Sequence, residues 1–233
     1  MNLREKENKL FEKWSKDRVR FAKDGAGENF ENQKIKLIFI GKETNDTGET
    51  FDWRDYLNEG VFYRKTNKPF ETSYNLYRWA KFLLDGEMDF SEYKKIERNK
   101  NKRVDVFSRV AFINIKKETG GSSANCNTII ETGRKDKEYL KQQLELYTNN
   151  NDIKILFLLG DCIYTPIKEI LGKEKDRQFL NDSRFIDIYD NNLFVVRFYH
   201  QNCRNKECSK KNIYQLIKKV YDIINKNDTI KQP

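Results

Sequence analysis

The chain has 233 residues, enough for a single domain with a sizeable hydrophobic core. Charged residues make up 35% of it and aromatic residues 13%, so the chain is polar but has the rings to build a core, which excludes a disordered type. The net charge of +9 favours a polyanionic partner, first nucleic acid and then an anionic membrane surface. The alternative is a general bias towards lysine and asparagine.

No apolar run approaches the roughly 20 residues of a membrane-spanning helix. The opening segment MNLREKENKLFEKW is charged throughout and lacks the apolar centre of a signal peptide. We therefore expect a cytoplasmic monomer, without a membrane partner, whose cysteines are thiols. The cysteine spacing does not predict a metal or iron–sulfur site. The four cysteines are Cys126, Cys162, Cys203 and Cys208.

The first half of the chain alternates between helical and strand patterns. Residues 3–23 predict a helix with one apolar face. Residues 34–40, KIKLIFI, form a continuous apolar run that is typical of a strand buried on both faces. Residues 73–86 predict an aromatic helix closed by Gly86. Residues 109–115, RVAFINI, predict a second buried strand.

The second half repeats this alternation. We expect a helix at about 136–149 and a third strand at 153–160. The segment 161–172 predicts a helix capped by Asp161 and ended by Gly172. A fourth strand at 193–198 precedes a helix at about 209–226, which has a clear amphipathic stripe.

This alternation predicts an α/β fold, a three-layer α/β/α sandwich around a mainly parallel, four-stranded central sheet. We expect one domain over residues 1–233, with a motif-bearing core at about 34–205. In such sheets the ligand site lies outside the carboxyl ends of the strands. The candidate segments are therefore GKETND (41–46), KKETGGSSAN (116–125), GDC (160–162) and YHQNCRN (199–205). The only histidine of the chain, His200, is among them.

The order of these segments resembles the uracil-DNA glycosylase superfamily. FIGKETND looks like the segment of that family that positions the attacking water, with Glu43 two residues after Gly41. FINIKK is similar to the family's strand with a base-reading asparagine, which here is Asn114, followed by Lys117. LFLLGDC matches the third strand, which ends in Leu-Gly, and RFYHQNCRN matches the histidine and its DNA-inserting loop. The resemblance covers about residues 34–205.

The resemblance implies a DNA glycosylase that flips a uracil, deaminated or otherwise modified base out of DNA and hydrolyses its N-glycosidic bond, without a metal or other cofactor. A carboxylate such as Glu43 can stabilise the sugar cation and orient water, and neutral His200 can donate a hydrogen bond to the departing base. Asn114 can read the base edge, unless it pins a neighbouring loop. Phe51, and after it Trp53, could stack on the flipped base. Gly41 and Asn45 would complete the substrate pocket.

Further residues are candidates for DNA contacts, on single- or double-stranded DNA. The glycine turn could approach a phosphate, and the basic run 94–103 could add salt-dependent affinity. Arg204 could fill the gap left by the flipped base, because the loop has no leucine wedge. The candidate DNA-binding residues are Lys100, Lys102, Arg103, Lys117, Gly120, Gly121, Ser122 and Arg204.

Two positions depart from the family pattern. Thr44 and Gln201 stand where family members commonly have proline. These departures bear on the target base and on whether catalysis is retained. Two other functions are therefore open: a non-catalytic nucleic-acid-binding or defence protein on the same fold, and a hydrolase of small nucleosides or nucleotides.

Overall fold

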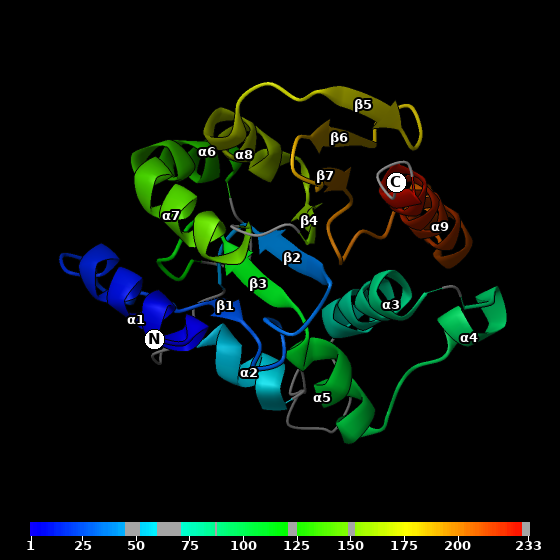
Figure 1. Ribbon diagram of the computed structural model, residues 1–233, viewed down its shortest axis with the longest axis horizontal. Helices are drawn as coiled ribbons and strands as arrows, with labels where there is room; N and C mark the ends of the chain where they lie inside the picture. Colours follow the sequence, from blue (N-terminus) through cyan, green and yellow to red (C-terminus); the bar gives the residue numbers. More distant parts are fainter. Residues whose placement is uncertain (45–51, 60–70, 87, 121–124, 149–151, 230–233) are drawn as a thin grey trace.

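A computed structural model describes the chain except for residues 45–51, 60–70, 87, 121–124, 149–151 and 230–233. Within the described part, seven strands form one mixed sheet in the order β1-β3-β2-β4-β7-β6-β5 (Figure 1). The strands are β1 (Gly25–Ala26), β2 (Ile35–Gly41), β3 (Ala111–Asn114), β4 (Ile153–Leu159), β5 (Asp176–Phe179), β6 (Phe185–Tyr189) and β7 (Leu193–Phe198).

Helices pack in two groups, and Figure 1 shows the groups on opposite sides of the sheet. One group consists of α1 (Leu3–Trp14), α6 (Cys126–Lys135), α7 (Lys137–Thr148) and α8 (Tyr164–Leu171). The other consists of α2 (Trp53–Glu59), α3 (Glu71–Asp85), α4 (Phe90–Lys94), α5 (Lys100–Ser108) and α9 (Lys210–Thr229). Two short 3₁₀ helices, η1 (Asp161–Ile163) and η2 (Lys206–Cys208), follow β4 and β7.

The α/β class predicted from the sequence is correct, and the four predicted strands are present as β2, β3, β4 and β7. They pair in parallel in the order β3-β2-β4-β7. Most of their residues are buried, since helices cover both faces of the sheet, which explains why their sequences read as apolar runs rather than alternating ones.

The prediction of four strands is wrong, because three antiparallel strands extend this parallel core. β1 pairs with β3 at one edge, and β6 and β5 extend the other edge beyond β7. β1 has only two residues, and β5 is an exposed, polar edge strand. The β6–β7 hairpin turns through Asn191 and Asn192, which both have φ of 58°. Asparagine tolerates this left-handed conformation, which a tight hairpin turn requires.

The five predicted helices are present as α1, α3, α7, α8 and α9, whereas α2, α4, α5 and α6 were not predicted. α1 ends at Trp14 rather than at residue 23. Asp161 does not cap the helix after β4, because its carboxylate accepts hydrogen bonds from Arg184 and Arg197. Gly133 within α6 allows close contact with α8: a Cβ there would lie 2.6 Å from Pro166 Cβ. In the described part of the chain, no helix has both the length and the apolarity to cross a membrane.

Candidate functional site

The parallel strands place the candidate segments at one edge of the sheet. β2, the first of these strands, lies between β3 and β4, so the connections from β2 and from β3 lead to opposite sides of it. A crevice forms outside the carboxyl ends of the strands at such a switch point. Here the residues after β2, Gly160 after β4 and His200 after β7 follow these carboxyl ends.

Gly160 brings two ionisable residues, Lys42 and His200, together at the carboxyl ends of the strands. Its φ of +119° lies in a region that residues other than glycine rarely adopt. A Cβ on Gly160 would lie 3.5 Å from Lys42 Cε and 3.8 Å from His200 Cβ. Lys42 and His200 therefore flank the same glycine, although they come from β2 and β7, which are not neighbours in the sheet.

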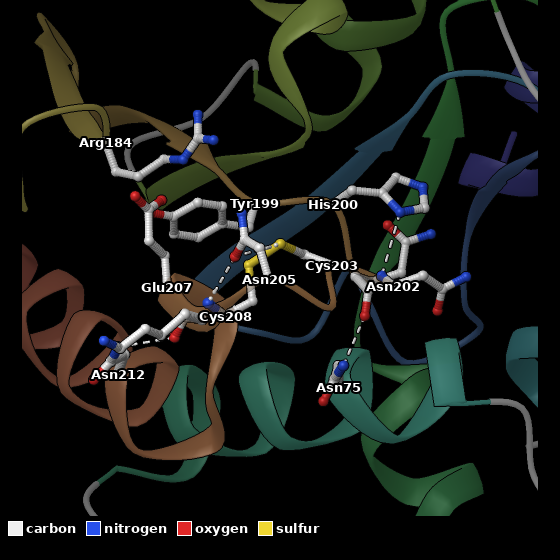
Figure 2. Close-up of a disulfide and its surroundings, with 12 residues drawn as sticks. Asn75, Arg184, Tyr199, His200, Asn202, Cys203, Asn205, Glu207, Cys208 and Asn212 are labelled. Carbon is white, nitrogen blue, oxygen red and sulfur yellow. Dashed lines mark hydrogen bonds between the residues drawn. A yellow bond between two sulfur atoms is a disulfide. The ribbon is translucent and has the colours of Figure 1, made fainter.

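His200 is held as a neutral imidazole. Burial and, after it, the charge of Lys42 lower the pKa of His200 from its usual value of 6.5. The backbone N–H of Asn202 donates to His200 Nδ1 at 3.2 Å (Figure 2). Because Nδ1 accepts this bond, the neutral ring carries its proton on Nε2, which can then donate to a ligand.

Glu43 is fixed by the segment that follows β3. Its Oε2 lies 2.5 Å from Lys116 Nζ, and only 8% of the Glu43 side chain is exposed. Gly120 makes room for the carboxylate, because a Cβ there would lie 2.2 Å from the same oxygen. The Gly120 N–H also donates to the Thr44 carbonyl at 2.8 Å. The predicted glycine turn therefore positions Glu43, and its expected contact with a phosphate stays untested.

Asn114 contacts the protein itself rather than open space. It is 2% exposed, and its Nδ2 donates to Thr44 Oγ1 at 3.3 Å. Its Oδ1 lies against Gly41, where a Cβ would be only 2.5 Å away. Trp53 Nε1 donates to the same Thr44 hydroxyl at 2.8 Å, and its ring stacks on Phe112. These contacts favour the interpretation that Asn114 pins a neighbouring loop, and they give Gly41 and Trp53 packing roles.

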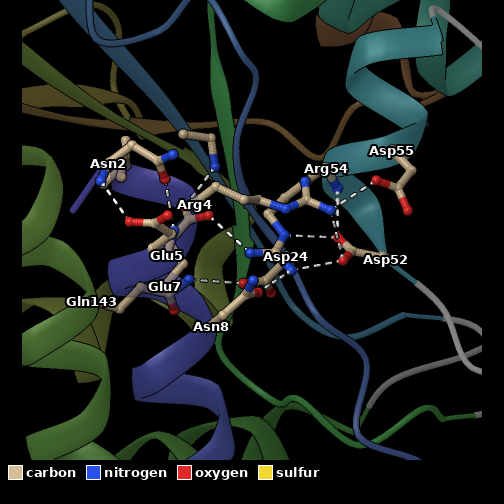
Figure 3. A network of polar contacts seen from close by, with 12 residues as sticks. Asn2, Arg4, Glu5, Glu7, Asn8, Asp24, Asp52, Arg54, Asp55 and Gln143 are labelled. Carbon is tan, nitrogen blue, oxygen red and sulfur yellow. Dashed lines mark hydrogen bonds and ion pairs between the residues drawn. The ribbon is translucent and has the colours of Figure 1, made fainter.

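Lys117 does not contact DNA, so that prediction is wrong. The residue is fully buried, and its Nζ lies 2.6 Å from Asp24 Oδ1 and 2.8 Å from Gln143 Oε1. Asp24 and Gln143 belong to a buried polar network that extends through Glu7 to Arg54 (Figure 3). The lysine therefore joins β3 to α7 and to the segment before β1. In the sequence Lys117 stands between Lys116 and Glu118, and nothing there indicates its distant partners Asp24 and Gln143.

The basic run around α5 is only partly available to a ligand. Arg103 is 3% exposed and donates to the Glu97 carbonyl, so its predicted DNA contact is also wrong. The side chains of Lys100 and Lys102 are exposed on α5, and Lys102 lies 3.9 Å from the Glu97 carboxylate. Arg204 is exposed in the loop after His200. DNA binding by these three residues stays a prediction.

All four cysteines are paired, so the prediction of thiols is wrong. Cys126 at the start of α6 is bonded to Cys162 in η1, and Cys203 is bonded to Cys208 in the loop after His200 (Figure 2). Both disulfides therefore lie in segments that follow parallel strands of the sheet. The cysteines of the first pair are 36 residues apart in the chain, and no pattern between them indicates that they lie close together.

Four predicted site residues lie outside the described residues: Asn45, Phe51, Gly121 and Ser122. Sequence reasoning missed Lys42, whose charge acts on His200, and Lys116, which forms an ion pair with Glu43. Both belong to segments that follow parallel strands, so the rule that located the other candidates applied to them as well.

No protein-family model matches the chain, and no curated protein is similar to it in sequence.

Proposed function

We propose that the chain is a DNA glycosylase similar to the uracil-DNA glycosylase superfamily. The observation that carries this proposal is the pair of Lys42 and neutral His200 on Gly160, at the sheet edge to which Glu43 also belongs. Cleavage of an N-glycosidic bond places negative charge on the departing base and positive charge on the sugar. Lys42 and neutral His200 can stabilise the negative charge on the base, and the Glu43 carboxylate can stabilise the positive charge on the sugar.

In the proposed reaction the C1′–N bond of a flipped nucleotide breaks, and its electron pair leaves with the base. His200 Nε2–H donates a hydrogen bond to a base oxygen, while the Lys42 ammonium offsets the charge of the base. Glu43 orients a water molecule, whose oxygen forms the new bond to C1′ and whose proton passes to the carboxylate. Lys116 keeps Glu43 in place through their ion pair. The products are a free base and an abasic site.

A second candidate is a non-catalytic DNA-binding protein. Asn114 favours it, because the carboxamide that would select the base is already bonded to Thr44. Base selection in the glycosylase proposal must therefore use other groups. On either proposal the partner is DNA, whose phosphates contact exposed cations of the protein, so that binding weakens as salt rises. A monomeric protein in the cytoplasm stays our expectation.

An excision assay separates the two candidates. Oligonucleotides carrying uracil, hypoxanthine or a modified cytosine, and phage DNA with hypermodified bases, are incubated with the protein and then treated with alkali to cleave abasic sites. We expect breaks at one type of base, and rates about 100-fold lower for Glu43→Gln and His200→Ala with DNA binding retained. Glu169→Gln is a matched control, because this carboxylate pairs with Arg134 on the helical surface. Salt-sensitive binding without breaks on any substrate would favour the non-catalytic candidate.

A further inference from the structure

A cavity of about 280 Å³ lies beside His200, between α3, the start of α9 and the loop after β7. Among its described lining residues, only His200 also belongs to the proposed catalytic groups. The volume is at the small end of ligand pockets, which suits a single nucleotide-sized group rather than a larger cofactor. Residues that bear on its chemistry are Tyr74, Arg78, Tyr93, Gln201 and Lys210.

The cavity is cationic. Arg78 and Lys210 line it, and none of its described lining residues is a carboxylate. Arg78 is 4% exposed, and no described carboxylate lies within ion-pair distance of its guanidinium. Instead it donates to the carbonyls of Lys94 and Lys95, which follow one another at the end of α4. Burial lowers the pKa of Arg78, as expected for a cation without a full counter-charge.

The loop that forms one wall of the cavity is held in place from α3. Asn75 Oδ1 accepts a hydrogen bond from Arg78 Nη1 at 3.3 Å, and Asn75 Nδ2 donates to the Gln201 carbonyl at 2.6 Å. Figure 2 shows Asn75 reaching from α3 to the loop that also carries His200. Hydrogen bonds thus connect the cation to the loop that carries His200, so both are positioned before any ligand binds.

Two further features indicate what kind of molecule would fit. Gln201 Oε1 is buried and has no hydrogen-bond partner among the described residues, so it can accept from a ligand donor. The rings of Tyr74 and Tyr93 flank the guanidinium, whose Cζ lies 5.9 and 5.7 Å from their centroids. An anion next to a flat group with a hydrogen-bond donor would satisfy all of these residues.

We propose that this cavity binds one nucleotide unit, with its phosphate at Arg78 and Lys210 and a base or sugar donor at Gln201 Oε1. The proposal concerns binding alone and does not depend on base excision. The same phosphate chemistry is offered by a free nucleotide and by one nucleotide of a DNA strand, and both are therefore tested.

The test is a calorimetric titration with thymidine 5′-monophosphate, thymidine and a five-residue oligothymidylate. We expect binding of a phosphate-bearing ligand, none of thymidine, and an affinity that falls as salt rises. Lys210→Ala should weaken binding about 3- to 10-fold. Lys211→Ala is the matched control, since Lys211 is the next exposed residue of α9 but does not line the cavity. Arg78→Met should weaken binding at least about 10-fold.

The outcomes are decisive in each direction. Binding of the monophosphate that depends on Lys210 supports the proposal with a free nucleotide as ligand. Binding of the oligonucleotide alone, again dependent on Lys210, supports it with a strand as ligand. No binding of either, or equal effects of Lys210→Ala and Lys211→Ala, would overturn it. If the Arg78→Met protein does not fold, Gln201→Leu is measured in its place. Unchanged affinity of the Gln201→Leu variant would contradict the proposed contact of Gln201 with the base or sugar. Failure of excision would leave these results unaffected.

Discussion

Thr44 Oγ1 accepts hydrogen bonds from Asn114 Nδ2 at 3.3 Å and from Trp53 Nε1 at 2.8 Å. One buried hydroxyl thus joins the end of β2 to the end of β3 and to the start of α2. The family that the sequence resembles commonly has a proline at this position, and a proline side chain could not accept either hydrogen bond. The departure from the family pattern therefore has a structural consequence, because Asn114 is used to hold the loop that carries Glu43.

Thr44→Val should destabilise the fold by about 1–3 kcal/mol, since it leaves two buried donors without an acceptor. Denaturant unfolding measures the change. Thr44→Ser keeps the hydroxyl and should lose much less stability. Thr128→Val, at an exposed site on α6, should stay within about 0.5 kcal/mol of the wild type. Equal losses for Thr44→Val and Thr44→Ser would contradict a role of the hydroxyl.

The pKa of His200 can be measured without ambiguity, because the chain has a single histidine. An NMR titration should give a midpoint below 6.5. Lys42→Met should move it upwards, because the repulsion of the imidazolium is removed, while Lys42→Arg should leave it low. Since the folded-state pKa is depressed, the stability linked to His200 is present above about pH 6.5 and is lost as the pH falls through the folded value. A midpoint above 6.5 would contradict the neutral histidine.

Lys117 and Lys102 should behave in opposite ways. Lys117→Met leaves Asp24 as an unpaired buried charge and should cost about 3–5 kcal/mol of stability. Lys102→Ala should change stability by less than about 0.5 kcal/mol. In DNA-binding titrations, Lys102→Ala should reduce the slope of log affinity against log salt by about 1. An unchanged slope would remove Lys102 from the DNA contacts, and a stable Lys117→Met protein would contradict the buried pair.

The two disulfides should contribute unequally to stability. In the chain-entropy account, the loop between Cys126 and Cys162 is worth about 4 kcal/mol and that between Cys203 and Cys208 about 2 kcal/mol, since their separations are 36 and 5 residues. Paired Cys→Ser variants, unfolded under oxidising conditions, measure each contribution. Thiol titration of the unfolded protein provides the check, because four reactive thiols before any reduction would show that neither bond is formed.

The sequence predicted the parallel core well because buried parallel strands leave a direct signal. LIFI (37–40) and ILFLL (155–159) are continuous apolar runs, and the polar residues that follow them necessarily reach one sheet edge. The antiparallel strands were missed for the converse reason. β6 carries Asp187 within an apolar pattern, and this carboxylate is buried only because Arg177 and Tyr164 bind it from β5 and α8.

The side chains of the candidate site were harder to assign than the segments. Asn114 was predicted to read a base, and Lys117 and Arg103 to contact DNA, but a sequence does not say which group will satisfy a polar atom. All three bind other parts of the protein: Thr44, Asp24 and the Glu97 carbonyl. Lys42, in contrast, was not predicted as a site residue. It becomes a candidate only because the fold places it beside Gly160 together with His200.

The pairing of β2 with β4 has a consequence for how the chain acquires its structure. Ile35 pairs with Ile153, so the centre of the sheet joins segments from opposite parts of the chain. The β6–β7 hairpin, in contrast, closes locally through Asn191 and Asn192. Local pairings pay little loop-closure entropy and form early, whereas distant parallel pairings form slowly. We therefore expect refolding to be limited by assembly of β2 onto β4, the step that also brings Lys42 next to Gly160.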